Sequence, residues 1–237
     1  MSKDNLFQSD NHPQKFSFND QVTQVFDDML NRSVPFYQNI LNQIAQCCTM
    51  PTLPNGIIYD LGCSTGALIG ALNIQKNDRQ YVGIDNSEAM VRQAQSQSID
   101  VQFNYQFQTG DIQQLEPLND AACIVCNLVL QFTSLDMRQP IIDSLFNQLN
   151  PGGVLIIVEK IKQQNPQFQA HYNQKFYEYK RNHGYTQAEV ERKESSLTHV
   201  LWPQTSQYYD DILSQCKPSA WDVFFKWYNF IGYIAQK

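Results

Sequence analysis

The spacing of hydrophobic positions changes near residue 56, and this change predicts two kinds of structure. Before it, apolar residues recur at helical spacing over residues 22–29 and again over 37–48. After it, short continuous apolar runs alternate with amphipathic segments. Strands that are apolar on both faces and separated by helices favour a parallel sheet covered on both sides. The expected strands cover residues 57–61, 81–84, 103–109, 123–127 and 154–158.

Helices are expected between these strands, with bounds that follow from caps and helical spacing. They begin at Ala67 and at Ser87, and a third covers residues 135–150. Pro151-Gly152-Gly153 is predicted to turn the chain into the next strand. The fold class is therefore α/β.

Residues 160–217 interrupt this alternation with further helices. Thr186 and Glu189 form a capping-box pattern, and Ser206 is expected to cap another helix. The aromatic, alternating segment 221–235 predicts a terminal antiparallel hairpin with a turn near Lys226.

The pattern divides the chain into two parts. We predict an N-terminal helical cap, residues 1–55, and an α/β domain, residues 56–237, with a helical insertion at about 160–217. Residues 1–18 are polar, and we expect them to be partly mobile.

Composition limits the function classes. The 237 residues carry a formal net charge of −6 and are 42% hydrophobic, so a packed core is expected and direct nucleic-acid binding is not. No apolar run approaches the roughly 18 residues of a membrane helix, and the N-terminal residues lack the apolar core of a signal peptide. We expect a cytoplasmic protein without membrane contact.

Six cysteines show no disulfide framework. Cys123-x-x-Cys126 lies in an apolar run and lacks a second such pair or a histidine at zinc-finger spacing. We interpret the pair as buried strand residues rather than a metal or redox site, and no metal site is predicted.

The strongest local signal is Asp60-Leu61-Gly62-Cys63-Ser64-Thr65-Gly66, directly between a strand and a helix. Small residues at 62, 64 and 66 let the backbone turn tightly and approach a ligand, and the next helix offers free N–H groups. Plain tight turns and dinucleotide sites share such loops. This loop is not Gly-x-Gly-x-x-Gly, which disfavours a nicotinamide dinucleotide.

Two acids and an amide follow the next strands. Asp85, 23 residues after Gly62, is placed to accept two hydrogen bonds from a ribose diol, although it also reads as a helix-start acid. Asp111 follows a third strand, where it is placed to accept from an adenine amine with Ile112 over the ring; alone it is an ordinary turn. Asn127 ends an apolar strand and needs a partner from protein, water or ligand.

Several motifs together resemble one known family. They are Arg32-Ser33-Val34-Pro35-Phe36-Tyr37, Asp60-Leu61-Gly62-Cys63-Ser64, Ile84-Asp85-Asn86-Ser87, Leu130-Gln131-Phe132, Asn150-Pro151-Gly152-Gly153, Lys180-Arg181-Asn182-His183-Gly184-Tyr185 and Tyr228-Asn229-Phe230. From about residue 6 to the C-terminus the chain resembles the carboxy-S-adenosylmethionine synthase family, which has the class I methyltransferase fold. The resemblance implies a Rossmann-like, mostly parallel seven-stranded sheet with a C-terminal antiparallel hairpin.

The resemblance also implies a reaction. Members of this family combine S-adenosylmethionine with prephenate, whose carbon dioxide is captured to give carboxy-S-adenosylmethionine and phenylpyruvate. A separate enzyme then uses the product to carboxymethylate a wobble uridine of tRNA. Members are homodimers that exchange inserted helices, and the aromatic residues over 168–179 are placed to form such a surface or to pack within one chain.

Matching the family residue by residue implies the cofactor contacts. Tyr37 also reads as a core residue, since it lies on the apolar face of its helix. The implied contacts are Tyr37, Gly62, Cys63, Ser64, Asp85, Asn86, Asp111, Ile112 and Asn127.

One position departs from the family. An arginine that contacts the product carboxylate is replaced by Glu194, and a glutamate repels a carboxylate where an arginine attracts it. Arg192 and Lys193 are adjacent, but neighbours on a helix point about 100° apart. An ordinary small-molecule methyltransferase therefore remains an alternative, as does a module that binds the nucleoside without turnover. The sequence identifies no general base.

Overall fold

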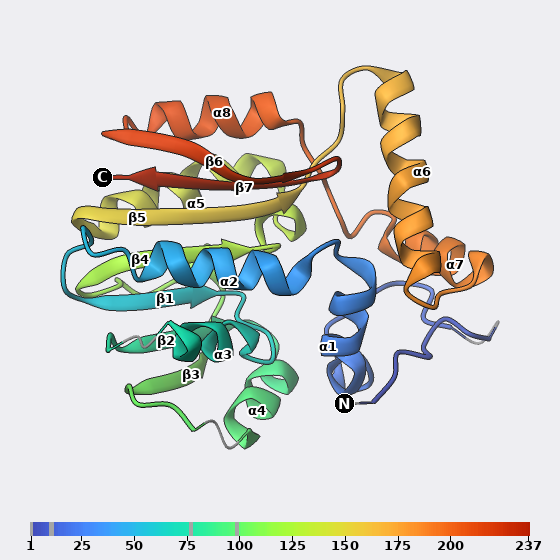
Figure 1. Cartoon of the computed structure of the whole chain (residues 1–237), viewed down its shortest axis with the longest axis horizontal. Helices are drawn as coiled ribbons and strands as arrows, with labels where there is room; N and C mark the ends of the chain where they lie inside the picture. The colour runs from blue at the N-terminus through green and yellow to red at the C-terminus, as the bar shows by residue number, and fades with distance from the viewer. Residues whose placement is uncertain (1, 10–11, 76–77, 98–99) are drawn as a thin grey trace.

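The computed structural model describes residues 2–9, 12–75, 78–97 and 100–237, and it shows a central sheet covered by helices on both faces (Figure 1). In these ranges seven strands form one sheet in the order β3-β2-β1-β4-β5-β7-β6. They are β1 (Ile57–Leu61), β2 (Tyr81–Asp85), β3 (Tyr105–Thr109), β4 (Ala121–Asn127), β5 (Leu149–Lys160), β6 (Ala220–Trp227) and β7 (Phe230–Gln236).

The sheet is parallel except at its C-terminal hairpin. β1 pairs in parallel with β2 and β4, β2 with β3, and β4 with β5. β7 runs antiparallel between β5 and β6. The predicted α/β fold, with its mostly parallel seven-stranded sheet and terminal antiparallel hairpin, is confirmed.

Helices cover both faces of the sheet and one of its ends. The α-helices of the described residues are α1 (Asp20–Ser33), α2 (Tyr37–Cys48), α3 (Ala67–Ile74), α4 (Glu88–Ser96), α5 (Leu135–Gln148), α6 (Pro166–Asn182), α7 (Gln187–Leu197) and α8 (Ser206–Gln215), with short 3-10 turns η1 (Ile112–Gln114) and η2 (Leu130–Phe132). None of them is long and apolar enough to cross a membrane.

Two apolar clusters sit on opposite faces of the sheet. On one face α2, α3 and α4 pack with residues such as Ile58 and Val125. On the other face α5 and α8 pack with residues such as Ile124 and Ile157. Cys123 and Cys126 are fully buried in β4, as expected of apolar strand residues.

α1, α6 and α7 stand beside the carboxyl ends of the parallel strands, at the right of Figure 1. α8, by contrast, returns to the sheet and packs on it. Within residues 160–217, only α6 and α7 therefore stand at the end of the sheet. The division of the chain into parts stays a prediction.

The expectation that residues 1–18 are partly mobile does not hold for all of them. Phe7 and Phe16 are buried against α1, 1% and 6% exposed. Arg32 Nη1 donates to the Asp4 carbonyl at 3.0 Å and lies 3.1 Å from Asp28 Oδ2. The N-terminal segment is thus held by an aromatic cluster and by a buried guanidinium.

Local corrections follow from caps and pairing. The helix predicted over 135–150 ends at Gln148, and its successor strand already begins at Leu149. The Pro151–Gly153 turn lies inside the bounds of β5, yet the pairing with β4 skips it, passing from Leu149 to Val154. Thr205, not Ser206, caps α8. The hairpin turns after Trp227 rather than at Lys226, because β6 pairs Trp227 with Phe230.

The core predicts a clear contrast between two isoleucine substitutions. Ile156 is fully buried in β5, whereas Ile74 at the end of α3 is 71% exposed. We expect Ile156→Ala to lower the free energy of unfolding by about 2–5 kcal/mol, because it leaves a cavity between sheet and helices. Ile74→Ala is expected to change it by less than about 0.5 kcal/mol. Urea denaturation of both variants checks this, and equal losses would contradict the placement of the core.

Candidate active site

A cavity of about 410 Å³ lies at the carboxyl ends of the parallel strands. Its wall is built by loops after β1, β2, β3 and β4 and by residues of α1, α2, α6 and α7. All nine residues predicted to contact the cofactor line it: Tyr37, Gly62, Cys63, Ser64, Asp85, Asn86, Asp111, Ile112 and Asn127. The fold thus brings them together, and their contact with a ligand stays a prediction.

The loop after β1 requires glycine at two positions. Gly62 has φ +72°, and a Cβ there would lie 2.2 Å from Val129 Cγ2. Gly66 has φ +82°, and a Cβ there would lie 2.6 Å from Phe107 Cζ. Ser64 between them also adopts a left-handed conformation, φ +49°, which is unfavourable for a residue with a Cβ. The loop therefore holds a strained backbone against the cavity.

The Asp85 side chain links the loop after β1 to the loop after β2 by hydrogen bonds. The Ser64 N–H donates to Asp85 Oδ2 at 2.9 Å, and the Ser87 N–H donates to Oδ1 at 2.8 Å. Burial raises the pKa of Asp85, and the two N–H bonds oppose that shift. Each carboxylate oxygen has a second lone pair, so the side chain is able to fix the backbone and still accept from a ligand hydroxyl.

The carboxyl ends of β3 and β4 present further polar groups. Asp111 caps η1, accepting from the Gln113 N–H at 2.9 Å. Asn127 Oδ1 is buried and has no hydrogen-bond partner among the described residues. Since an unsatisfied buried oxygen is costly, Asn127 points to a ligand or water in the cavity.

Glu159 positions the loop after β4, and sequence reasoning missed it. Its Oε1 accepts from the Leu130 N–H at 2.9 Å and its Oε2 from the Gln131 N–H at 2.9 Å. Burial raises the pKa of Glu159 to about 8, although the Arg138 charge and the N–H bonds lower it. The signal was present in the sequence, because a single acid directly follows the apolar run 154–158.

Asp60 was quoted in the loop motif but not assigned a role. It lines the cavity and its Oδ2 accepts from the Tyr81 hydroxyl at 2.7 Å. Burial raises the pKa of Asp60 to about 7, and the Asp85 charge acts in the same direction. A cationic ligand in the cavity would favour its ionised form.

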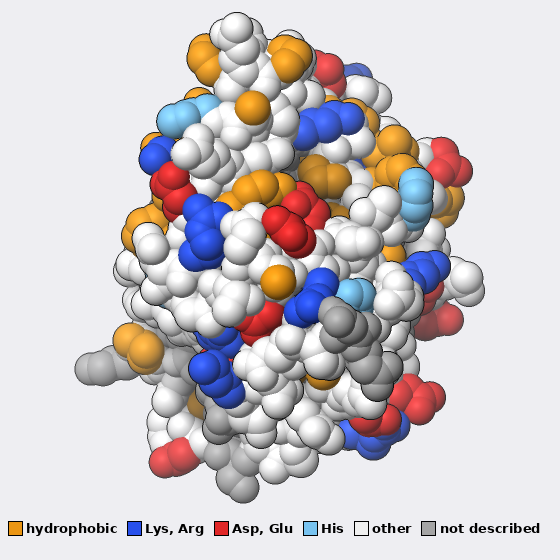
Figure 2. All heavy atoms as spheres, turned by 90° about the vertical axis from the view of Figure 1, so that its right-hand side faces the viewer, with side chains coloured by type: hydrophobic (Ala, Val, Ile, Leu, Met, Phe, Trp, Pro, Cys, Tyr) orange, Lys and Arg blue, Asp and Glu red, His pale blue; other side chains and the backbone are white. Residues whose placement is uncertain are grey.

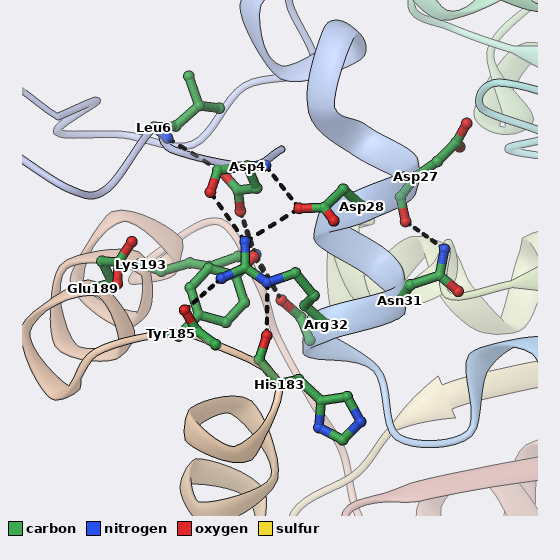
Figure 3. A network of polar contacts seen from close by, with 12 residues as sticks. Asp4, Leu6, Asp27, Asp28, Asn31, Arg32, His183, Tyr185, Glu189 and Lys193 are labelled. Carbon is green, nitrogen blue, oxygen red and sulfur yellow. Dashed lines mark hydrogen bonds and ion pairs between the residues drawn. The ribbon is translucent and has the colours of Figure 1, made fainter. Parts of the chain in front are cut away.

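Three lysines also line the cavity: Lys160, Lys180 and Lys193, of which the sequence analysis considered only Lys193, next to the replaced arginine. Lys193 belongs to a polar network with Asp4, Arg32 and Tyr185 (Figure 3). In the sequence, lysines at the end of a strand, such as Lys160, or on a helix, such as Lys180 and Lys193, are indistinguishable from surface lysines. Their burial depends on how α6 and α7 pack over the sheet end.

Arg192 and Glu194 are not among the residues that line the cavity. Arg192 Nη1 donates to the Phe7 and Gln8 carbonyls. Glu194 is exposed, and the Tyr177 hydroxyl donates to its Oε2 at 2.6 Å. A role for either residue in holding a carboxylate stays a prediction, whereas the adjacent Lys193 does line the cavity.

The surface over α6 and α7 is mixed in character. Acidic, basic and hydrophobic side chains are interspersed on this face, as Figure 2 shows. Over the described residues, no group of three or more His, Cys, Asp or Glu is placed to hold a metal ion.

The hydrogen-bond acceptors of the cavity fit an adenosyl nucleoside. The tight loop at Gly62, the carboxylates of Asp85 and Asp111 and the unsatisfied Asn127 oxygen surround one cavity. Ribose hydroxyls and an adenine amine are donors that match these acceptors.

Comparisons with known proteins agree with this interpretation. Residues 54–215 match the family model described as a methyltransferase domain. Solved structures with the same fold include the plantazolicin methyltransferase BpumL in complex with SAH, with a TM-score of 0.63, 13% identity and coverage of 92% of this chain and 93% of that one. Magnesium protoporphyrin IX methyltransferase from Synechocystis, with bound SAH, has a TM-score of 0.60 at 16% identity and coverage of 88% and 87%.

Curated relatives match over the full chain. The carboxy-S-adenosyl-L-methionine synthase of Wolinella succinogenes is 34% identical, covering 99% of this chain and 98% of that protein. The synthase of Methylococcus capsulatus is 33% identical, covering 100% of both. The chain belongs to the carboxy-S-adenosyl-L-methionine synthase family and is an S-adenosylmethionine-dependent transferase with a methyltransferase domain.

Proposed function

We propose that this protein converts S-adenosylmethionine and prephenate to carboxy-S-adenosylmethionine, phenylpyruvate and water. The carboxyl carbon lost by prephenate becomes the new carboxylate of the nucleoside, and the displaced methyl proton leaves in the water. The observation that carries the proposal is one cavity that combines nucleoside acceptors with buried ammonium groups. An anionic second substrate and a cationic nucleoside both find opposite charges there.

The chain's own groups would bind, orient and exclude water. Asp85 and Asp111 hold the nucleoside, and Asn127 gains its missing partner. S-adenosylmethionine supplies a methyl carbon made acidic by its sulfonium. Phe18, Phe176 and the packing of α1, α6 and α7 over the cavity keep water from the reacting groups.

The wider role is part of the same proposal. The product would serve a separate enzyme that carboxymethylates the wobble uridine of tRNA, and the net charge of −6 agrees with a protein that does not itself hold tRNA. We propose a cytoplasmic homodimer. Phe168 on α6 is 57% exposed, and Tyr172 packs on Tyr228 at 4.8 Å between ring centroids, so this helix offers an aromatic surface for a second copy.

A second candidate is an ordinary methyltransferase acting on a small molecule. The observation that favours it is Glu194, which occupies the position of the family's carboxylate-binding arginine and contacts Tyr177 at the surface. A methyl acceptor with a cationic or hydroxyl group would suit such a residue better than an acid.

The identity of the product distinguishes the two candidates. We expect the purified protein, incubated with S-adenosylmethionine and prephenate, to form phenylpyruvate and a nucleoside heavier by the mass of one carbon dioxide. Mass spectrometry and phenylpyruvate absorbance measure both products. Omission of prephenate is the control. Conversion to S-adenosylhomocysteine with an added acceptor, without a heavier nucleoside, would identify an ordinary methyltransferase.

Asp85→Asn tests the nucleoside site. Both carboxylate oxygens accept backbone N–H groups, and an amide has only one oxygen, so one N–H loses its acceptor. We expect the Kd for S-adenosylhomocysteine to rise about tenfold or more, which corresponds to about 1.4 kcal/mol. Asp211→Asn, an exposed acid on α8, is the matched control and should leave the Kd unchanged. Calorimetry measures both, and unchanged binding by Asp85→Asn would contradict the site.

The raised pKa of Asp60, about 7, predicts a pH dependence. Below that pKa the carboxyl is protonated in the free protein, and above it the group is a carboxylate that attracts a sulfonium. We therefore expect S-adenosylmethionine to bind up to about tenfold more tightly at pH 8 than at pH 6. Asp60→Asn should remove most of this dependence. Calorimetry of the two proteins at both pH values checks it, and an equal dependence in the variant would assign it to another group.

A further inference from the structure

Two ammonium groups of the cavity form no ion pair with any residue that the structure describes. Lys160 ends β5 and Lys180 lies in the last turn of α6. Both nitrogens stand over the Phe176 ring, 4.6 and 4.2 Å from its centroid. No hydrogen bond or ion pair joins either one to another described residue. Two ammonium groups therefore contact one aromatic ring in the wall of the cavity.

Lys193, the third lysine, is different because it is paired. Its Nζ donates to Ser33 Oγ at 2.8 Å and lies 3.7 Å from Asp4 Oδ2. Figure 3 shows it pointing into the network around Arg32. The positive charge of Lys193 is largely balanced by these partners, so it does not need a ligand as counterion. It still contributes to the electrostatic potential in the cavity.

The unpaired lysines are held at a cost. Burial lowers the pKa of Lys160, and burial together with the Lys160 and Lys193 charges lowers the pKa of Lys180 well below its usual range. Glu194 acts on both in the opposite direction, but it is exposed and bound to Tyr177. A lysine that only stabilised the fold would be expected to have a nearby partner. We infer that the counterion of these two lysines is a negatively charged group of a ligand.

The strand order separates the lysines from the nucleoside acceptors. Asp85 and Asp111 follow β2 and β3 on one side of β1, whereas Lys160 ends β5, two strands away on the other side. Asn127 at the end of β4 lines the space between, and Phe230, paired with Lys160 in the sheet, lines the cavity on the far side of β5. A nucleoside held by the acids leaves the lysine side of the cavity for the second substrate.

We propose that Lys160 and Lys180 form an anion site that binds the carboxylate groups of the second substrate, a small organic acid. For its place in catalysis the assignment rests on the proposed function. The assignment also accounts for the substitution at Glu194. The positive charge of the family's arginine at that position is supplied here by Lys160 on β5 and Lys180 on α6. Lys160 and Lys180 act here as substrate-binding residues.

The nucleoside's own carboxylate is the competing ligand for these lysines. S-adenosylhomocysteine carries that carboxylate and lacks the second substrate. Its binding therefore separates the two assignments. Thermal stability adds a third readout, because removing an uncompensated buried charge should not destabilise the fold.

The experiment uses Lys160→Met and Lys180→Met, which keep most of the apolar stem. Lys175→Met, on the same helix but paired with Glu178 at the surface, is the matched control. Calorimetry measures S-adenosylhomocysteine binding to each protein, and then prephenate binding to the protein saturated with that nucleoside. Melting temperatures are recorded in parallel, and Lys180→Arg tests rescue by another cation.

We expect Lys180→Met to weaken prephenate binding about 30-fold or more, the scale of a charged hydrogen bond in a desolvated site. The Kd for S-adenosylhomocysteine should stay within about threefold, and the melting temperature should not fall. Lys160→Met should behave alike, Lys180→Arg should recover part of the affinity, and Lys175→Met should match the parent.

Two results would overturn the assignment. One is prephenate affinity that is unchanged in both methionine variants. The other is a loss of S-adenosylhomocysteine affinity as large as the loss of prephenate affinity. It would show that the lysines bind the carboxylate of the nucleoside. Prephenate that binds in a Lys180-dependent way but is not converted would refute the proposed reaction and leave the anion site in place.

Discussion

The parallel pairing of β1 with both β2 and β4 is the constraint from which the site follows. Parallel strands end at the same edge of a sheet, and the chain leaves β1 and β4 toward opposite faces, so a crevice opens between their loops. Gly62 lies against Val129 across this crevice, where a Cβ would be 2.2 Å from Val129 Cγ2. α1, α6 and α7 then close the open end and convert the crevice into a cavity.

Two kinds of buried polar group in and beside this cavity have different physical roles. Glu159 and Asp85 are satisfied by backbone N–H groups, so they fix loops whatever the cavity contains. Among the described residues, Lys160 and Lys180 have no hydrogen-bond or ion-pair partner, and Asn127 has an unsatisfied oxygen. The satisfied groups give the cavity a fixed shape, and the unsatisfied ones set what it binds. Buried polar groups without partners lower the stability of the fold, and such groups are found mainly at binding and catalytic sites.

The sequence predicts the sheet well, and the nine residues that it selects as cofactor contacts all line one cavity, because both depend on local patterns. Apolar strands, the loop at Gly62 and the acids at strand ends carry their signal within a few residues. The lysines do not, since Lys180 becomes buried only through packing of α6 against distant strands. The N-terminal segment was misjudged for the same reason: Phe7 is covered by α1 and by residues of α7, which no local pattern shows. The cap of α8 was predicted at Ser206 and lies at Thr205. The sequence does not distinguish two adjacent hydroxyl residues as caps.

The substitution at Glu194 shows why a single aligned position is a weak guide to a charge site. A carboxylate ligand responds to the summed field of nearby charges, and at the low effective dielectric of a cavity that field extends over several residues. Glu194 points to the surface and contacts Tyr177, so its negative charge is partly screened by solvent. Lys160 and Lys180 line the cavity and form no ion pair within the described part of the chain. Lys160 on β5 and Lys180 on α6 add positive charge to the cavity beside Lys193 on α7, so the residue at position 194 does not by itself fix the charge that a ligand meets.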